Sequence, residues 1–278
     1  MNRKFFAAIT LTATLLLTGC GGGDKPADKP AGDKPAAKEV TLKIGATPVP
    51  HAELLEQIKP DLKDAGINLE IVEFNDYVQP NIALNDKELD ANFFQHEPYL
   101  NDFIKEHTDV KLTNAGGIHI EPMGIYSKKI KSLDELTEGA AVSIPNDPTN
   151  GGRALLLLQK AGLLKLKDGA NETATVQDIA ENPHNIVIQE VEAAQLPRTL
   201  EDVSISIINT NFAMNADLNP MKDALFIEDK TSPYVNIIAV RDGDENRDDI
   251  KKLLTALKSD KIKKFIEDNY KGAIVPAF

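Results

Sequence analysis

The sequence predicts an α/β fold that begins near residue 39. Short apolar segments typical of strands alternate there with longer amphipathic segments typical of helices. Such alternation is characteristic of parallel strands joined by helical crossovers. The chain has 278 residues, of which 42% are hydrophobic and 27% charged, which is an ordinary balance for a soluble globular protein of one large or two average domains. We therefore expect two successive α/β units.

The first unit is expected to alternate strand and helix three times. The apolar and β-branched residues favour strands at Val40 to Ala46, Asn68 to Phe74 and Asp90 to Phe94. Helical periodicity predicts helices over His51 to Ala65, Val78 to Leu84 and Pro98 to His107. Gly66 suits the end of the first of these helices.

The second unit follows with further strands. We expect them at Val110 to Gly116, His119 to Tyr126, Ala140 to Ile144, Ile186 to Val191, Val203 to Ile208 and Val235 to Val240. Ser132 followed three residues later by Glu135 predicts a capped short helix. Longer helices are expected over Gly151 to Ala161, Arg247 to Leu257 and Lys261 to Asn269.

The first 38 residues predict export and a lipid anchor. A basic start is followed by an apolar run, Phe5 to Leu17, that is too short to span a bilayer. The residues Leu17-Thr18-Gly19-Cys20 resemble the bacterial lipobox, and Cys20 is the only cysteine. We expect residues 1–19 to be a lipoprotein signal peptide and Cys20 to be acylated. Residues 20–38 repeat Asp-Lys-Pro and are expected to form a flexible tether.

Charge and motifs narrow the function classes. The formal charge is −12, or −14 with 29 basic and 43 acidic residues once Arg3 and Lys4 leave with the signal peptide. Nucleic acid is therefore excluded as an electrostatic partner. Short signatures of nucleophilic, nucleotide-dependent or zinc-protease catalysis are absent from the sequence. This absence disfavours an enzyme without excluding one, since carboxylate-based chemistry leaves no short signature. We expect a protein that is not an enzyme and needs no cofactor.

The run "PNDPTNGGRALLLLQKAGLL", Pro145 to Leu164, predicts an anion site. Thr149 or Asn150 is a candidate helix cap, and the two glycines that follow are expected to leave backbone N–H groups open. Arg153 is expected in the first turn, where it is unfavourable for the helix dipole. Its planar guanidinium suits bidentate capture of a carboxylate.

Three asparagines are candidates for a binding site. Asn209 and Asn211 follow an apolar strand directly, and ligands of α/β sheets lie beyond the carboxyl ends of strands. Asn236 lies within a strand that is otherwise built to be buried, so its amide needs a partner. That partner is either a ligand or a group of the protein itself.

The aromatic stretch "DANFFQHEPYL", Asp90 to Leu100, allows three interpretations. Strand alternation places either Phe93 or Phe94 in the core and the other on the opposite face, and His96 and Tyr99 share one face of the following helix. The cluster is ordinary core, the wall of a pocket, or part of a metal site. The last interpretation requires His51, His96 and His119 to converge.

Taken together, these runs resemble a known family, the NlpA/MetQ-type lipoproteins that are methionine-binding components of ABC importers. The resemblance covers nearly all the chain after the tether and rests on "FNDYVQPN", "DANFFQHEPYL", "GIYSKKIKSLDEL", "PNDPTNGGRALLLLQKAGLLKLKDG", "LPRTLED", "INTNFA" and "SPYVNIIAV". It implies a periplasmic-binding-protein fold of two α/β lobes joined by two crossover segments, with a ligand cleft that closes by hinge motion. Lobe 1 would comprise residues 39–121 and 242–278, and lobe 2 residues 122–241.

The resemblance also implies which residues bind the ligand. Carried over by position, they are Tyr77, Phe94, His96, Tyr99, Arg153, Asn209 and Asn236. Phe93 is then the phenylalanine that is expected in the core. Arg153 would hold the α-carboxylate, the two asparagines would bind the amino-acid head, and the aromatic residues would line a slot for a thioether. Asn209 is preferred over Asn211. Neutral amides and backbone carbonyls would hold the ligand ammonium, since these motifs offer no acidic partner.

We therefore expect a monomeric, membrane-tethered receptor on the extracytoplasmic side. It would capture L-methionine and deliver it to the permease and ATPase complex of an ABC transporter. Alternatives are another apolar amino acid, D-methionine or a methionine-containing dipeptide, since one methylene changes affinity by only about 1–3 kcal/mol. A metal-binding import lipoprotein, or an adhesin or enzyme on the same scaffold, are further alternatives.

Overall fold

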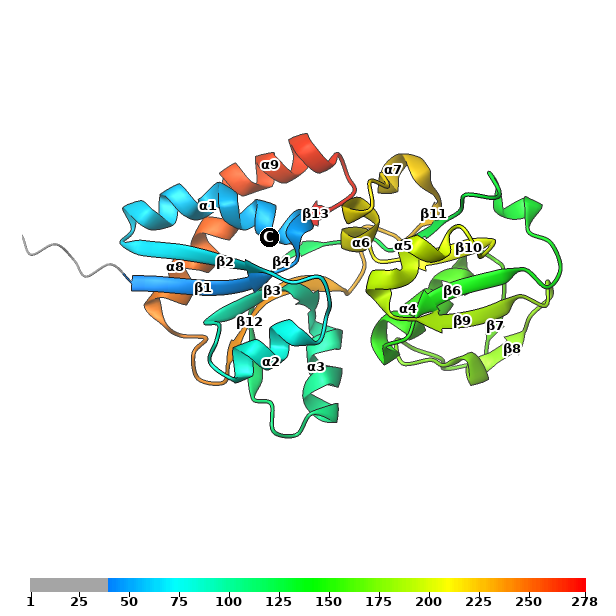
Figure 1. Cartoon of the computed structure of the whole chain (residues 1–278), viewed down its shortest axis with the longest axis horizontal. Coiled ribbons are helices and arrows are strands. Elements are labelled where there is room, and N and C mark those ends of the chain that lie inside the picture. The colour runs from blue at the N-terminus through cyan, green and yellow to red at the C-terminus, as the bar shows by residue number, and fades with distance from the viewer. Residues whose placement is uncertain (1–39) are drawn as a thin grey trace, which may run out of the picture. The chain divides into compact units, whose positions relative to one another are not determined.

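The first sheet contains strands from both the N-terminal and the C-terminal parts of the described chain. The structure is a computed structural model that describes residues 40–278. Its six-stranded sheet has the order β13-β4-β12-β3-β1-β2 (Figure 1). β1 pairs in parallel with β2 and β3, whereas β12 runs antiparallel to both β3 and β4. The strands are β1 (Val40–Ala46), β2 (Ile67–Glu73), β3 (Ala91–His96), β4 (Leu112–Ile120), β12 (Val235–Arg241) and β13 (Val275–Pro276).

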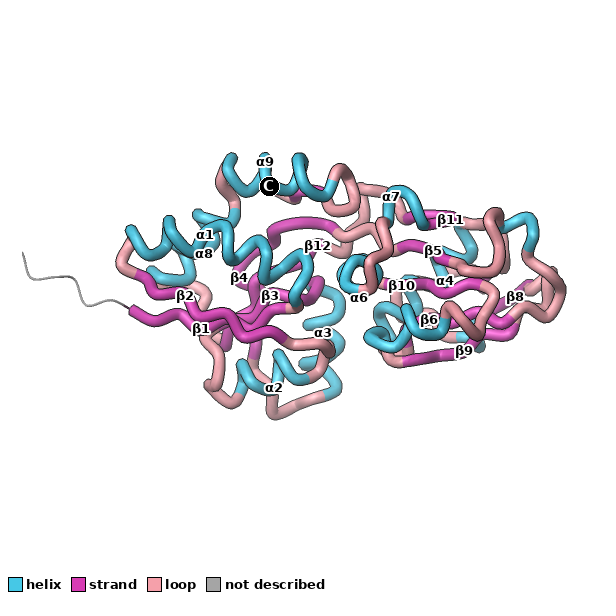
Figure 2. The backbone as a smooth tube through the Cα atoms, turned by 45° about the horizontal axis from the view of Figure 1, so that its top comes forward, coloured by secondary structure: helices cyan, strands magenta, loops and turns pink. Residues whose placement is uncertain are grey.

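Helices cover both faces of this sheet (Figures 1 and 2). One face packs on α1 (Glu53–Asp64), α8 (Asp248–Leu257) and α9 (Asp260–Tyr270) through a core that includes Phe93. The opposite face packs on α2 (Gln79–Asn85) and α3 (Glu97–Glu106) through a second core that includes Phe94. Consecutive phenylalanines point to opposite faces because side chains alternate along a strand. The expected assignment of Phe93 to the core is confirmed.

The second sheet has five strands in the order β11-β5-β10-β6-β9. They are β5 (Gly124–Tyr126), β6 (Ala141–Pro145), β9 (Val187–Val191), β10 (Ile205–Ile208) and β11 (Ala224–Ile227). One face packs on α4 (Pro148–Lys160), and the other on α5 (Leu196–Thr199) and α6 (Thr210–Asn215). The remaining elements are a two-stranded sheet, β7 (Lys165–Leu166) with β8 (Ile179–Glu181), α7 (Pro220–Asp223), and helical turns at Pro48–Ala52, Leu133–Glu135, Val176–Asp178 and Ala193–Gln195.

The chain passes between the two sheets twice. Residues 121–123 lead from β4 to β5, and residues 228–234 lead from β11 back to β12. Two α/β sheets joined by two connecting segments are the architecture that the sequence predicts, and the periplasmic-binding fold is confirmed. The division into lobes at particular residues stays a prediction, with one correction.

That correction concerns β12. The expected boundary at residue 241/242 assigns Val235–Arg241 to lobe 2, whereas β12 lies between β3 and β4 in the first sheet. A second difference is that β4 is one continuous strand where the sequence suggested a break near Gly116 and Gly117. Gly117 pairs with Ile237 within the ladder, and glycine is favoured there because a Cβ would come within 2.7 Å of a Val235 methyl group. Long-range pairing, which local patterns do not encode, decides both points.

Several predictions fall on residues outside the described range. The signal peptide, the lipobox with Cys20 and the tether all lie within residues 1–39. Among the described residues, no helix is both long enough and apolar enough to cross a bilayer.

Candidate functional site

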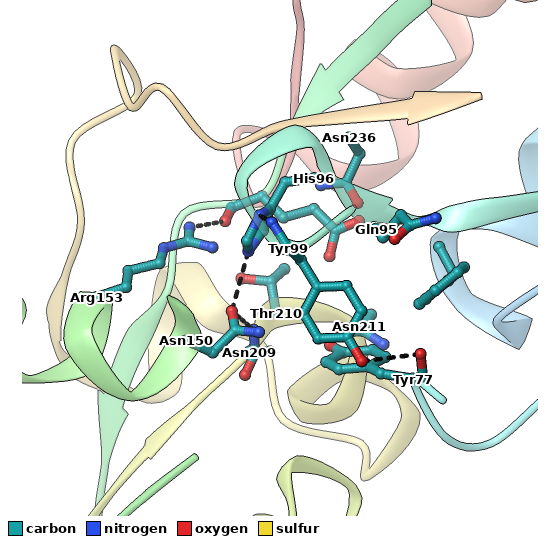
Figure 3. Close-up of a pocket in the computed structure, with 12 residues that line it drawn as sticks. Tyr77, Gln95, His96, Tyr99, Asn150, Arg153, Asn209, Thr210, Asn211 and Asn236 are labelled. Atoms are coloured by element: carbon teal, nitrogen blue, oxygen red, sulfur yellow. Dashed lines mark hydrogen bonds between the residues drawn. The ribbon is translucent and has the colours of Figure 1, made fainter. Parts of the chain in front are cut away.

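A pocket between the two sheets is lined by all seven residues that the family resemblance implies as ligand contacts. Residues of both sheets line it: Tyr77, Phe94, Gln95, His96, Tyr99, Glu121, Asn150, Arg153, Asn209, Thr210, Asn211 and Asn236 (Figure 3). Apart from Tyr77, which is half-buried, these residues are buried. The structure therefore brings the candidates together, and their role as ligand contacts stays a prediction.

Three aromatic rings form one wall. The ring of Tyr77 lies 5.8 Å from that of Phe94 and 5.7 Å from that of Tyr99, in tilted and edge-on arrangements that aromatic pairs prefer. The Tyr99 hydroxyl donates to the Tyr77 carbonyl oxygen over 2.9 Å. All three residues pack into or against the core between the first sheet and α2 and α3. Core packing thus fixes the rings in place.

His96 ends β3 and caps α3. Its Nδ1 accepts a hydrogen bond from the Tyr99 backbone N–H over 3.1 Å, so Nε2 carries the proton and donates to Asn150 Oδ1 over 3.1 Å. Burial, and then the charge of Arg153, lower the pKa of His96 to about 3. The imidazole is therefore a neutral donor at physiological pH. It precedes the helix, so the expectation that it shares a helical face with Tyr99 is wrong.

The start of α4 differs from the expectation. Asp147, and not Thr149 or Asn150, is the N-cap, and its carboxylate accepts from the Asn150 backbone N–H over 2.9 Å. Gly151 lies inside the helix, where its N–H already donates to the Asp147 carbonyl, so no open anion site is formed there. A Cβ on Gly152 would lie 2.3 Å from the Glu172 carbonyl oxygen, so glycine is required there for close packing.

Arg153 occupies the second turn of α4 and is held on three sides. Its Nε donates to Glu228 Oε1 over 3.1 Å, and Nη2 donates to Glu228 Oε2 and to the Glu121 carbonyl oxygen. The guanidinium carbon lies 4.2 Å from the centre of the Tyr234 ring, a cation–π contact. Glu228 thus occupies the edge of the guanidinium, Nε and Nη2, that can bind a carboxylate in a bidentate manner. The sequence analysis assigned bidentate binding to a ligand carboxylate instead. Nη1 makes no hydrogen bond within residues 40–278.

A chain of amides leads from Asp147 into the pocket. Asn150 Nδ2 donates to both Asp147 carboxylate oxygens, at 3.0 and 3.1 Å. Asn150 Oδ1 therefore faces away and accepts from Asn209 Nδ2 over 2.8 Å. Asn209 Oδ1 is left buried, with no hydrogen-bond partner among the described residues. Asn209 therefore presents its acceptor, Oδ1, to the pocket, because its donor, Nδ2, is already bonded to Asn150.

His51, His119 and Glu121 form a second buried polar cluster beside the pocket. The Nε2 atoms of His51 and His119 lie 3.2 and 2.7 Å from Glu121 Oε1. His51 Nε2 also lies 3.1 Å from Asn236 Oδ1, so the buried amide of Asn236 has a protein partner for its oxygen. The Asn236 Nδ2 donor makes no hydrogen bond in the described part of the chain.

Burial sets the protonation of this group. Desolvation lowers the pKa of His51 to about 4 and that of His119 to about 3, so both rings are neutral at physiological pH. Burial raises the pKa of Glu121, an effect opposed by His51, the charge of Arg153 and the backbone N–H of Asn211. Because His51 is itself neutral, it supports the carboxylate as an N–H donor and not as a cation.

The three histidines that a metal site would require do not all converge. His51 and His119 converge with Glu121, and one ligand atom from each lies within 4.8 Å of the others. His96 does not join them, because its Nε2 is directed to Asn150. The structure therefore does not form the set of three histidines on which the metal-import alternative depends.

Sequence reasoning missed five lining residues: Gln95, Glu121, Asn150, Thr210 and Asn211 were not assigned to the pocket, although Asn150 was a proposed cap and Asn211 the rejected alternative to Asn209. Asn211 Oδ1 accepts from the Tyr77 hydroxyl over 2.6 Å. Glu121 had one usable signal. It follows His119 by two residues at the end of an apolar strand, so the two side chains share a face.

Comparisons with known proteins agree with this architecture. A sequence profile of the NlpA lipoprotein family matches residues 42–278. The D-methionine-binding lipoprotein MetQ of Escherichia coli K12 is 43% identical over 276 residues, 98% of this chain and 97% of that protein. The methionine-binding lipoprotein MetQ of Bacillus subtilis is 42% identical over 281 residues, 99% of both.

A solved structure is similar over the same region. It is a nutrient-binding protein from Burkholderia cenocepacia bound to methionine, with 48% identity and a TM-score of 0.82, and the match covers 85% of this chain and all of that one. Profile, sequence identity and fold therefore agree over nearly the whole chain: it belongs to the NlpA lipoprotein family.

Proposed function

We propose that this protein is the substrate-binding lipoprotein of an ABC importer and that its pocket captures L-methionine. The observation that carries the proposal is the juxtaposition of an aromatic wall, Tyr77, Phe94 and Tyr99, with the guanidinium of Arg153 in one enclosed pocket. The methionine-bound relative from Burkholderia cenocepacia supports the choice of ligand. The protein has the role of a receptor and not of an enzyme.

The two ends of the pocket suit the two ends of methionine. A thioether makes favourable contacts with aromatic rings, so the side chain would lie against Phe94 and Tyr99. Arg153 has five N–H donors, and the two on Nη1 are free of hydrogen bonds to residues 40–278. The ligand carboxylate would bind there, with the free Nδ2 of Asn236 as a second donor. Glu228 would remain in place as the partner of Arg153.

Delivery would depend on the N-terminal region. Cys20 at the end of the lipobox would carry the lipid, and the tether would hold the binding fold on the extracytoplasmic side of a membrane. The bound, closed form would then dock on the permease and ATPase complex. Cys20→Ala should release the protein from membranes and leave ligand affinity unchanged. Persistent membrane association of the variant would contradict anchoring through Cys20.

The identity of the ligand can be tested on purified protein. The protein is denatured, and released small molecules are identified by mass spectrometry while metals are measured by elemental analysis. We expect methionine in about equimolar amount. Release of zinc with no amino acid would contradict the proposal and favour the cluster of His51, His119 and Glu121 as the binding centre.

D-methionine is a second candidate. The relatives from Escherichia coli, Salmonella and Yersinia are named D-methionine-binding lipoproteins. Chiral chromatography of the released amino acid separates the two enantiomers directly. A released pool that is mainly the D-enantiomer would replace L-methionine as the proposed substrate.

A further inference from the structure

The charges around the pocket do not balance. Arg153 is a cation of the pocket, and Glu228 pairs with it. Glu121 is a second buried acid, with 7% of its side chain exposed, and it also lines the pocket. Its partners within 4 Å are two histidines, and no Lys or Arg nitrogen of residues 40–278 forms an ion pair with it. The pocket therefore presents an acidic group without a cationic partner.

Both histidines contact the same oxygen of this acid. His51 Nε2 faces two acceptors, Glu121 Oε1 and Asn236 Oδ1, which places the His51 proton on Nε2. The Thr47 hydroxyl then donates to Nδ1 over 2.7 Å. His119 Nε2 approaches the same carboxylate oxygen, Oε1, over 2.7 Å. Both N–H donors therefore converge on Oε1. Oε2 accepts no side-chain hydrogen bond from the described residues, and the backbone N–H of Asn211 also supports the carboxylate.

A second acceptor faces the same pocket. The amide chain from Asp147 through Asn150 orients Asn209 so that its Oδ1 is buried without a donor. A buried acceptor left without a donor is unfavourable, so a ligand that supplies N–H groups gains affinity there. From the sequence we expected only neutral amides and backbone carbonyls around the ligand ammonium. The structure adds a carboxylate.

We propose that Glu121 binds the ammonium group of the ligand and thereby makes the site selective for zwitterionic amino acids. The inference rests on the proposed function, because it names the residue that recognises the amine of the amino acid. An ammonium group offers three donors and a full charge. Glu121 supplies the opposite charge, and Asn209 Oδ1 supplies an additional acceptor. Arg153 is left to recognise the carboxylate.

This division of labour predicts a specific effect of Glu121→Gln. The variant keeps the size of the side chain and an oxygen for the histidine donors but removes the charge. Hydrogen bonds to charged groups are about twice as strong as neutral ones, so methionine affinity should fall about 10- to 100-fold. A ligand without the amine, 4-(methylthio)butanoate, should bind both proteins weakly and about equally.

Calorimetric titration of both ligands into wild type and Glu121→Gln therefore tests the inference. We expect wild type to prefer methionine strongly and the variant to lose most of that preference. Glu88→Gln, an exposed acid on the loop before β3, is the matched control and should behave as wild type. An unchanged preference in Glu121→Gln, or equal weakening of both ligands, would overturn the role of Glu121. Wild type that binds neither ligand would instead contradict the proposed function.

A second measurement does not depend on how the variant folds. In a crystal structure of the wild-type protein with methionine, the ammonium nitrogen should lie about 2.7–3.2 Å from a Glu121 carboxylate oxygen. A separation beyond about 4 Å, with methionine in the pocket, would overturn the inference and leave the proposed function intact.

Discussion

The two walls of the pocket are built in different ways. The aromatic wall beside the first sheet is built of rings that are also members of a hydrophobic core, such as Phe94 and Tyr99. The wall from the second sheet consists of polar groups held by hydrogen bonds, from Asp147 through Asn150 to Asn209, and by the Arg153–Glu228 pair. Substitutions in the first wall should therefore affect folding and binding together. Substitutions in the second should affect mainly binding.

The largest effect is expected in the polar wall. Arg153→Ala removes the donors proposed for the carboxylate and leaves Glu228 without its cationic partner. We expect calorimetry to detect no methionine binding, a loss of at least about 100-fold, because a buried charge-assisted contact is removed. Lys25→Ala in the tether is the control and should bind normally. Equal affinities in the two variants would exclude Arg153 from the site.

A matched pair of phenylalanines tests the aromatic wall. Phe93→Leu and Phe94→Leu should each lower the free energy of unfolding by about 1–2 kcal/mol, because both side chains are buried in a core. Only Phe94→Leu should weaken methionine affinity, since Phe93 faces the core on the other side of the sheet. Denaturant titration and calorimetry on both variants separate the effects. Similar affinity losses in both variants would contradict this division of the strand.

The pH dependence of stability should come largely from the first sheet. His51, His96 and His119 belong to its elements, and burial lowers their pKa values to about 4, 3 and 3. The unfolded chain takes up protons near pH 6.5, and the folded protein does so only near pH 3–4. Stability is therefore complete above pH 6.5 and is lost as the pH falls toward 4.

Denaturant titrations at pH 7.5 and pH 5 measure this loss. Each of the three histidines should remove about 2 kcal/mol of unfolding free energy over that interval. His119→Gln should lose about 2 kcal/mol less than wild type over the same interval. An identical loss in the variant would show that His119 is not held neutral in the folded state.

The smallest effect is expected where the walls meet. The Tyr77 hydroxyl donates to Asn211, which follows a strand of the second sheet, whereas the Tyr99 hydroxyl donates within the first wall. Tyr77→Phe should weaken methionine affinity about fivefold, the equivalent of one hydrogen bond of about 1 kcal/mol. Tyr99→Phe should change affinity less. A larger loss of affinity in Tyr99→Phe than in Tyr77→Phe would contradict the proposal that the Tyr77–Asn211 hydrogen bond favours closure of the two lobes.

Sequence patterns predicted the residues that line the pocket better than they predicted the acidic residues that hold them in place. Alternation placed Phe93 and Phe94 on opposite faces, and family resemblance gathered Arg153, Asn209 and Asn236 into what proved to be one pocket. Glu121 and Glu228 were missed because each lies just after a strand, where an acid is typical of ordinary exposed loops. The Glu228 carboxylate acts through Arg153, 75 positions away in the chain, and the Glu121 carboxylate acts in part through His51, which precedes α1. Spacing along the chain carries no record of such contacts.

The cap of α4 shows the same limit at short range. Asp147, Thr149 and Asn150 are all acceptable caps by residue type. Asp147 is the N-cap, and Asn150 is instead directed from the Asp147 carboxylate toward His96 and Asn209. Three-dimensional context selected among residues that sequence rules treat as equivalent.

The central claim is that the pocket between the two sheets binds methionine. Its most direct test is calorimetric titration of L-methionine into wild-type protein that has been unfolded, dialysed free of ligand and refolded. We expect one binding site per chain, with a negative heat-capacity change from burial of the side chain against the aromatic wall. Absence of heat and of any shift in thermal unfolding at millimolar L-methionine would contradict it.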